Sequence, residues 1–232
     1  LLLSLVGQAA YNSKRKRKTK KIDLEQRLFV LQMLTHELRT PSTSLRLSLE
    51  SLRKEFDQLP KKSQVAFLRM TEELQRLDRV VETSKNYLRA ENGIAQSENT
   101  VSLNEAVESL AEKYNGKVIL QAAEPCSVSV NRYWLELCIQ NLIDNALAHG
   151  KPPVSLKLSR EKNSIVISIQ DQGVLSFRSL DEMTAPFKKS ETSKGLGLGL
   201  SIVQTVAEKM DAELVFTPTP TTFSIKLKEH NP

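Results

Sequence analysis

Helical periodicity is the feature that most restricts the fold of this 232-residue chain. Between residues 24 and 56, apolar side chains are mostly separated by three, four or seven positions: Leu24, Leu28, Leu31, Leu34, Leu38, Leu45, Leu49, Leu52 and Phe56. A second stripe of this kind contains Val65, Leu68, Leu74, Leu77, Val81, Ser84 and Leu88. Such spacing is typical of long amphipathic helices. We predict one helix that ends around residues 56–62 and a second over 63–91, which stops at Asn92–Gly93.

Two antiparallel helices joined by a short loop cannot bury both apolar stripes by themselves. A homodimeric four-helix bundle would bury them, and we favour it over a hairpin packed on the rest of its own chain, which would expose more apolar surface. Pro41 lies inside the first stripe and has no backbone N–H group. We expect a kink in the helix just after this position.

The second half of the chain has a different pattern. Residues 93–99 are mostly small and polar, which indicates a linker. Beyond it we predict strands over 101–103, 118–121, 127–130, 154–158, 164–170, 213–217 and 222–228, and helices over 104–114, 133–149 and 198–210. One sheet covered by one helical layer would make this an α/β sandwich. The predicted domains are therefore a helical domain at 22–93, a linker at 94–100 and a sandwich domain at 101–232.

The amino-terminal residues 1–21 combine an apolar run with a basic run. The apolar run, Leu1 to Ala10, is shorter than the roughly 20 residues that cross a bilayer. Seven cations follow between Lys14 and Lys21. This order is typical of the cytoplasmic end of a transmembrane helix, so we expect residues 1–21 to be a truncated membrane helix with its basic juxtamembrane segment. A solvated basic arm is the alternative.

The basic cluster also explains the charge of the whole chain. The formal net charge is +6, and removing the seven cations leaves the remainder near −1. This local origin argues against nucleic acid as a partner. Cys126 and Cys138 form no paired motif, so neither a disulfide framework nor a structural zinc site is indicated.

Several reactive side chains lie close together on the first predicted helix, in the segment Thr35-His36-Glu37-Leu38-Arg39-Thr40-Pro41. Arg39 and Thr40 follow His36 by three and four residues and share its face, while Glu37 is adjacent. A zinc motif of the His-Glu-x-x-His type would need a second histidine at position 40. A lone histidine on a helix is usually just an exposed side chain, so this segment requires support from elsewhere.

Three polar motifs in the second half indicate a nucleotide site. Asn141 and Asn145 lie four residues apart, and amide oxygens are suitable ligands for Mg²⁺. Asp171-Gln172-Gly173 follows a predicted strand, where a carboxylate can accept a hydrogen bond from an exocyclic amine. The run from Gly195 to Gly199 has glycine at alternate positions and precedes a helix, which allows phosphate to approach the backbone. It is not a P-loop, because no Gly-Lys-Ser or Gly-Lys-Thr follows.

In this order the motifs resemble those of sensor histidine kinases of two-component systems. His36 to Pro41 resembles the H-box, Asn141 to Ala146 the N-box, Asp171 to Gly173 the G1 box and Gly195 to Gly199 the G2 box, and Phe187 matches the F-box. The resemblance extends from about Leu24 to the last predicted strand. It implies a dimerisation and histidine phosphotransfer domain followed by a Bergerat-type (GHKL) ATP-binding domain.

The resemblance also implies an activity. ATP would phosphorylate His36, with Glu37 orienting the ring and accepting its proton. The phosphoryl group would then pass to an aspartate of a response regulator receiver domain. Thr40 would position a water that dephosphorylates this partner. The parent protein would be a homodimer of the bacterial inner membrane, with this chain on the cytoplasmic side.

The same resemblance assigns the nucleotide-binding residues. Asn145 would be the Mg²⁺ ligand, Asn141 its companion on the phosphate side and Asp171 the acceptor for the adenine amine. Further nucleotide-binding positions would be Gly173, Phe187, Gly195, Gly197 and Gly199. Two positions depart from the family pattern, since Ala148 replaces a common lysine or arginine and Leu175 replaces the second glycine of the G1 box.

Two other classes have the same fold. A pseudokinase or scaffold would keep the architecture without turnover, and Leu175 and Ala148 favour this reading. A chaperone-type or topoisomerase-type ATPase is the second alternative. Such ATPases usually have a catalytic glutamate before the asparagine, whereas here Asp144 precedes Asn145 and an acceptor histidine is present.

Overall fold

The computed structural model describes residues 2–93, 99–121, 124–173, 179–188 and 196–228. The chain divides into two compact units, Leu1–Leu88 and Arg89–Pro232. Each unit is described separately below. In the described part of the chain, no helix combines the length and apolar character needed to span a membrane.

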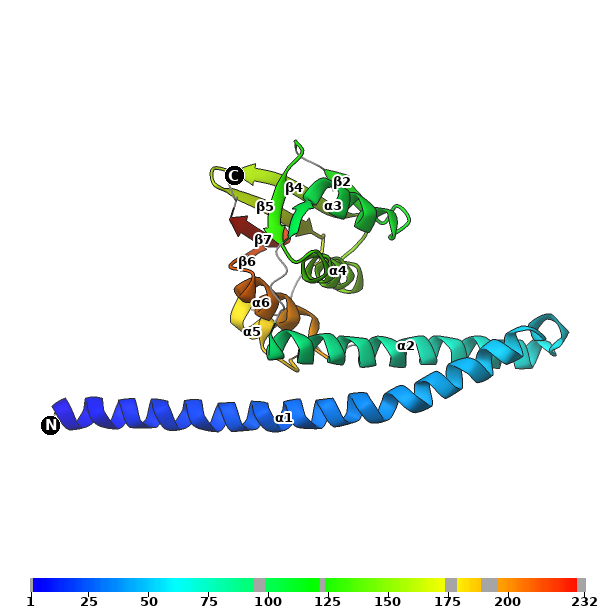
Figure 1. Ribbon diagram of the computed structural model, residues 1–232, viewed down its shortest axis with the longest axis horizontal. Helices are drawn as coiled ribbons and strands as arrows, with labels where there is room; N and C mark the ends of the chain where they lie inside the picture. The colour runs from blue at the N-terminus through cyan, green and yellow to red at the C-terminus, as the bar shows by residue number, and fades with distance from the viewer. Residues whose placement is uncertain (1, 94–98, 122–123, 174–178, 189–195, 229–232) are drawn as a thin grey trace. The chain divides into compact units, whose positions relative to one another are not determined.

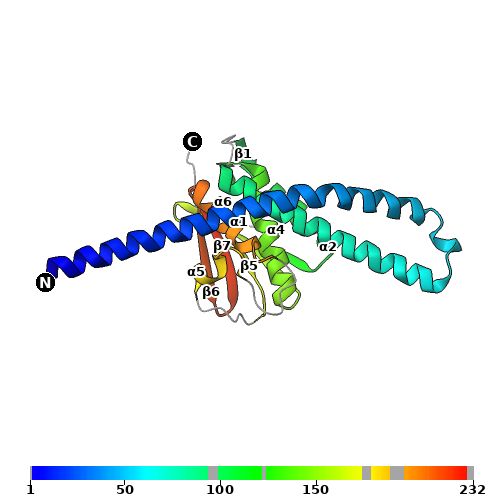
Figure 2. The same cartoon turned by 90° about the horizontal axis from the view of Figure 1, so that it is seen from below.

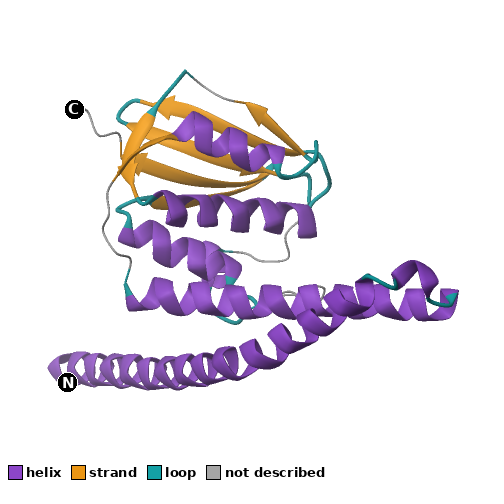
Figure 3. Ribbon diagram, turned by 45° about the vertical axis from the view of Figure 1, so that its right-hand side comes forward, coloured by secondary structure: helices purple, strands orange, loops and turns teal. Residues whose placement is uncertain are grey.

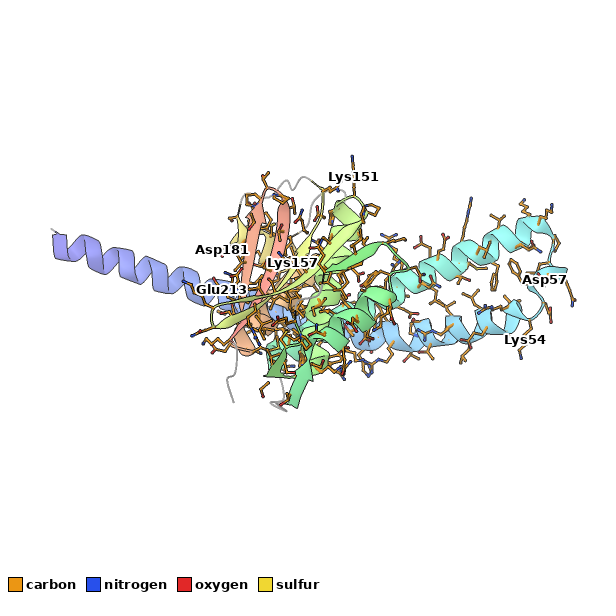
Figure 4. All side chains as sticks on the ribbon, turned by 90° about the horizontal axis from the view of Figure 1, so that it is seen from above. Lys54, Asp57, Lys151, Lys157, Asp181 and Glu213 are labelled. Carbon is orange, nitrogen blue, oxygen red and sulfur yellow. The ribbon has the colours of Figure 1, made fainter. Side chains whose placement is uncertain are left out.

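The first unit is a helical hairpin, as predicted. Helix α1 (Leu2–Arg53) is followed by a short 3₁₀ turn, η1 (Phe56–Gln58), and by helix α2 (Lys61–Asn92). Figures 1 and 2 show α1 and α2 as two arms joined by a tight turn. Lys54 and Asp57 lie in this turn (Figure 4). The first helix ends slightly earlier than predicted, and the second begins two residues earlier.

Aromatic packing and a backbone contact close the turn. The rings of Phe56 and Phe67 lie 5.3 Å apart between centroids. Gln64 Nε2 donates a hydrogen bond of 3.1 Å to the carbonyl oxygen of Phe56. Phe56 therefore belongs to the turn and not to the end of the first helix.

Pro41 lies inside α1, and the helix continues through it to Arg53. Figure 1 shows α1 as a single helix that bends along its second half without a break. Because proline has no N–H group, one backbone hydrogen bond of the helix is missing there. The hydrogen bonds of the turns on either side keep the helix continuous.

The apolar stripes of the hairpin are only partly covered. Leu31, Phe67 and Leu74 are buried. Several other large apolar residues of the hairpin remain exposed: Phe29, Val30, Met33, Leu34, Leu45, Leu47, Leu52, Val65, Leu68 and Met70. The hairpin therefore presents an apolar surface along much of its length.

The second unit contains a five-stranded sheet with the order β2-β4-β5-β7-β6. Its strands are β2 (Val118–Gln121), β4 (Val154–Glu161), β5 (Ser164–Gln170), β6 (Glu213–Pro218) and β7 (Thr221–Lys228). Strands β2 and β4 run parallel, and the other neighbours are antiparallel. Ile165, Ile167 and Ile169 of β5 are buried on the face that packs on the core, and Val166 on the other face is buried as well.

The prediction of a single sheet is wrong for two strands. β1 (Asn99–Ser102) and β3 (Ser127–Val130) pair with each other as a separate antiparallel sheet. Helix α3 starts at Leu103, directly after β1, and the Leu103 N–H group donates to the Cys126 carbonyl oxygen at 3.0 Å. The chain thus turns from this small sheet straight into the helical layer.

Three helices form a layer beside the five-stranded sheet: α3 (Leu103–Glu112), α4 (Arg132–His149) and α6 (Gly199–Lys209). Each contacts the sheet, and α4 packs against both α3 and α6 (Figure 3). The short helix α5 (Leu180–Thr184) was not predicted. Ser179 Oγ accepts a hydrogen bond from the Glu182 N–H group at 3.3 Å and caps its start.

Candidate functional site

His36 is an exposed side chain with a carboxylate beside it. Its side chain is 80% exposed, and Nδ1 lies 3.3 Å from Glu37 Oε1. Arg39 and Thr40 are exposed as well, whereas Thr35 is buried and donates to the Leu31 carbonyl oxygen at 2.7 Å. One turn of α1 therefore presents an imidazole, a carboxylate and a hydroxyl group to solvent.

Helix α4 places the two candidate amides in the second unit. Its first turn is capped by Asn131, whose Oδ1 accepts a hydrogen bond from the Trp134 N–H group at 3.3 Å. Asn141 Nδ2 donates to the Leu137 carbonyl oxygen at 2.8 Å, so its orientation is set by its own helix. Asn145 follows one turn later and is partly exposed.

The amino-terminal end of α6 lies against this part of α4. A Cβ atom on Gly199, the first residue of α6, would be only 3.1 Å from Asn141 Oδ1. The structure therefore brings Asn141 and Gly199 together, although they lie 58 positions apart in the sequence. Because a helix amino terminus favours anions, this junction is suitable for phosphate.

Asp171 is a buried carboxylate at the end of β5, with 5% of its surface exposed. Its Oδ1 accepts a hydrogen bond of 2.6 Å from the Gly173 N–H group. Burial raises the pKa of Asp171, while the Gly173 hydrogen bond and the nearby His149 oppose this shift. A carboxylate fixed in this way can accept a hydrogen bond from a ligand amine.

Two glycines allow the end of α4 to approach this carboxylate. A Cβ atom on Gly150 would lie 2.6 Å from the Asp171 Cβ, and one on Gly173 would lie 2.7 Å from the His149 carbonyl oxygen. Sequence reasoning identified Gly173 but missed Gly150. Its position directly after α4 suggests only a helix end, and the contact with Asp171 is a tertiary feature.

Thr221 is a second residue that sequence reasoning missed. It is buried at the start of β7, and its Oγ1 donates to the Gly173 carbonyl oxygen at 2.9 Å. Its own carbonyl oxygen accepts a hydrogen bond of 3.0 Å from the Asp171 N–H group. Thr221 thus holds both ends of the Asp171–Gly173 turn.

Phe187 and Gly197 are joined by their backbones. The Phe187 N–H group donates to the Gly197 carbonyl oxygen at 3.1 Å. Gly197 has a φ of +71°, and a Cβ atom there would lie 2.3 Å from the Lys188 carbonyl oxygen. Glycine is therefore required at position 197 for both conformation and space. Gly195 and Leu175 lie outside the described residues.

The side chains near this site can hold Mg²⁺ only together with phosphates and waters, and not as a metal cage built from protein groups alone. Among the described residues, no three His, Cys, Asp or Glu side chains gather as a metal cluster. Mg²⁺ is often held by one or two protein groups together with phosphates and waters, and Asn145 can supply such a group. Asp144, beside it, accepts a hydrogen bond of 3.0 Å from Tyr114 Oη.

Two protein families match the chain. The "His Kinase A (phospho-acceptor) domain" matches residues 26–93, and the "Histidine kinase-, DNA gyrase B-, and HSP90-like ATPase" matches residues 130–231. The chain belongs to the sensor histidine kinases. The phosphoacceptor match separates this histidine kinase core from other ATPases of the same sandwich fold.

The similar proteins include two bacterial sensor histidine kinases. VxrA of Vibrio cholerae is 34% identical over 226 residues, which cover 96% of this chain and 44% of VxrA. GtrS of Pseudomonas aeruginosa is 31% identical over 197 residues, with 82% and 39% covered. This kinase core therefore spans less than half the length of these relatives.

Solved structures confirm the fold. The Acinetobacter baumannii histidine kinase AdeS has a TM-score of 0.56 at 21% identity, with 84% of this chain and 98% of that chain covered. Full-length ShkA in complex with AMPPNP has a TM-score of 0.69 at 19% identity, with 87% and 46% covered. The predicted helical hairpin followed by an α/β domain is thus the fold of known histidine kinases.

Proposed function

We propose that this chain is the kinase core of a two-component sensor, which phosphorylates itself on His36 and then phosphorylates a response regulator. The observation that supports this most directly is the exposed imidazole of His36 with Glu37 at its Nδ1, inside the segment matched by the phosphoacceptor family. The second unit, with its match to the ATPase family, would bind ATP.

The contact with Glu37 suggests how His36 would react. If Nδ1–H donates to Glu37, the lone pair lies on Nε2, because the hydrogen bond at one ring nitrogen selects the tautomer. Nε2 would form the new bond to the γ-phosphorus of ATP while the bond to the ADP oxygen breaks. Glu37 would then take the Nδ1 proton, which leaves the phosphorylated ring neutral.

The nucleotide would be bound by groups of the second unit. Asp171 would accept a hydrogen bond from the adenine amine, and Asn141, Gly197 and Gly199 would lie beside the phosphates. Asn145 would hold Mg²⁺, which neutralises charge on the phosphates during transfer. An ATP analogue, AMPPNP, is bound in the ShkA structure, and we extend nucleotide binding to this chain by similarity.

We further propose that residues 22–93 dimerise through the exposed apolar surface of the hairpin. A second copy would cover side chains such as Phe29, Leu47 and Leu68 in a four-helix bundle. Within the predicted linker of residues 94–100, residues 94–98 precede β1 and would let the ATP-binding domain reach His36. Light scattering at several concentrations tests this dimer.

The basic run from Lys14 to Lys21 supports a membrane-attached parent protein. Cations gather on the cytoplasmic flank of membrane helices, so the kinase core would lie on the cytoplasmic side of the bacterial inner membrane. Fractionation of the parent protein between membrane and soluble extracts tests this placement.

Thr40 is proposed to act in the reverse reaction, where its exposed hydroxyl would position a water that attacks the phosphorylated regulator. We predict that Thr40→Ala keeps autophosphorylation within about twofold of wild type, because His36 and Glu37 are unchanged. It should slow dephosphorylation of the regulator at least about tenfold, a typical effect of losing one positioning hydrogen bond to a reacting group. Equal losses in both reactions would contradict this role.

Incubation with Mg²⁺ and ATP labelled at the γ-phosphate tests the central proposal. Wild type should become labelled in an acid-labile, base-stable form, and His36→Gln should remain unlabelled. Label that persists in His36→Gln would overturn the assignment. Nucleotide binding without any label in wild type would instead indicate a pseudokinase.

A further inference from the structure

One carboxylate of α2 accepts hydrogen bonds from two residues of α1. Ser42 Oγ donates to Asp78 Oδ1, and Arg46 Nη2 donates to Asp78 Oδ2 at 2.6 Å. Ser42 is 3% exposed and the Asp78 side chain is 29% exposed. We call these three residues the Asp78 cluster. It lies entirely within the hairpin and links its two helices.

The Asp78 cluster favours one setting of α1 against α2. A buried hydroxyl group is costly without a hydrogen-bond partner, so a shift of either helix that separates Ser42 from Asp78 is unfavourable. Arg46 follows Ser42 by one turn and uses the other carboxylate oxygen. Apolar contacts tolerate sliding and rotation, whereas a carboxylate bonded to a buried hydroxyl group and to a guanidinium is directional.

The Asp78 cluster begins directly after the turn that contains His36. Directly before Ser42, Pro41 cannot donate to the Glu37 carbonyl oxygen. Directly after it, Thr43 Oγ1 donates to the Arg39 carbonyl oxygen at 2.9 Å. Side-chain bonds of this kind and internal prolines both loosen a helix. Ser42 lies within this weakened segment and is joined to α2 by its hydrogen bond to Asp78.

We propose that Asp78 is a positioning residue for the phosphoryl transfer: through Ser42 and Arg46 it sets the rotation of the α1 turn that presents His36. This inference rests on the proposed function of His36. Asp78 does not touch the imidazole and takes no part in bond making. Asp78 therefore affects the rate of phosphoryl transfer. It should not affect ATP binding, because the proposed ATP site lies in the other unit.

The test compares variants of the whole chain in autophosphorylation at varied ATP. Asp78→Asn keeps the size of the side chain and weakens both hydrogen bonds, and Ser42→Ala removes one of them. We expect kcat to fall about tenfold in each, the size of effect that follows from losing a hydrogen bond to a charged group. KM for ATP should stay within about twofold of wild type.

A matched control uses Glu73, which pairs with Arg76 on the surface of α2 at 3.6 Å. Glu73→Gln makes the same change of charge at an exposed position of the same helix, and should keep the wild-type kcat. The exchange Ser42→Asp with Asp78→Ser restores a hydroxyl–carboxylate pair between the helices and leaves Arg46 one turn from the new carboxylate. It should recover most of the lost kcat.

The outcomes separate the two proposals. No label in wild type or persistent label in His36→Gln refutes the proposed function itself. With that function intact, a wild-type kcat in Asp78→Asn and Ser42→Ala overturns the positioning role. So does an equal loss in Glu73→Gln, or a loss of kcat that only parallels a loss of helical circular dichroism.

Discussion

Two effects act on the Asp171 carboxyl group in opposite directions: burial favours its protonated form, whereas accepting a hydrogen bond from an adenine amine favours its ionised form. Burial raises its pKa above the ordinary value, so the folded chain holds this proton more tightly than the unfolded chain does. Between the ordinary pKa and the raised one, stability therefore falls as pH rises, and above the raised pKa the ionised group destabilises the fold. The ionised form is nevertheless the better acceptor for an adenine amine.

We predict that Asp171→Asn separates these two effects. At pH 7 and without nucleotide, the variant should unfold at a temperature equal to or above that of wild type, because the buried charge is gone. The difference should shrink as pH falls through the raised pKa of Asp171. ATP affinity at pH 7 should fall at least about tenfold, through loss of a hydrogen bond to a charged group. Calorimetric titration and thermal unfolding across pH measure both.

Gly173 is needed for space and not for an unusual φ. We predict that Gly173→Ala lowers stability by about 1–3 kcal/mol, since its Cβ would meet the His149 carbonyl oxygen at 2.7 Å and backbone must move. ATP affinity should fall with it, because the Asp171 turn is displaced. Gly116→Ala is the control. Gly116 has a φ of +77°, and a Cβ atom there would have no other atom within 4 Å, so this substitution should lower stability without changing ATP affinity. Unchanged ATP affinity in Gly173→Ala would contradict this reading.

At the scale of elements, local patterns predicted the long segments well. β2, β3 and β5 have the predicted bounds, because their ends coincide with changes in apolar alternation and with turn residues. Helix α5 has only five residues and depends on one cap, so it has no periodicity to detect. The pairing of β1 with β3 depends on tertiary contacts that no local pattern encodes.

The same distinction applies to the site. Asn141, Asp171 and Gly197 were predicted as nucleotide-binding residues from a motif resemblance, and this role stays a prediction. Gly150 and Thr221 were missed, because they belong to no motif and reach the Asp171 turn only through the packing of α4 and β7.

Pro41 interrupts the backbone hydrogen bonds of α1 one turn after His36, and replacing it should change both the stability of α1 and the rate of autophosphorylation. In Pro41→Ala the new N–H group can donate to the Glu37 carbonyl oxygen, which should stabilise α1 by up to about 3 kcal/mol. The turn beside His36 becomes stiffer, so we expect slower autophosphorylation with an unchanged KM for ATP. Thermal unfolding and labelling kinetics measure the two effects.

Pro60→Ala provides the comparison for Pro41→Ala. Pro60 precedes α2, and its carbonyl oxygen accepts from Ser63 and Gln64, so its missing N–H group is not needed by a helix. Little change is expected there in either measurement. A less stable hairpin in Pro41→Ala would refute the interpretation of Pro41.

At the scale of the whole molecule, the compact units divide between Leu88 and Arg89, within the last turns of α2. Lys209, at the end of α6, donates to the carbonyl oxygens of Ala90 and Glu91, the latter at 2.9 Å. Ala90 is fully buried. A cation at the carboxyl end of a helix satisfies carbonyl groups that lack partners in the helix, so these contacts hold the end of α2 to the second unit.

This arrangement predicts where the ATP-binding part can be separated. A fragment of residues 89–232 should be more stable than one of residues 94–232 by about 1–3 kcal/mol, because only the longer fragment keeps the acceptors of Lys209. Lys209→Met keeps the length of the side chain without its charge. It should destabilise the longer fragment by a similar amount and leave the shorter one nearly unchanged. Equal urea midpoints for the two fragments, or equal effects of Lys209→Met in both, would place the end of α2 outside the stable unit.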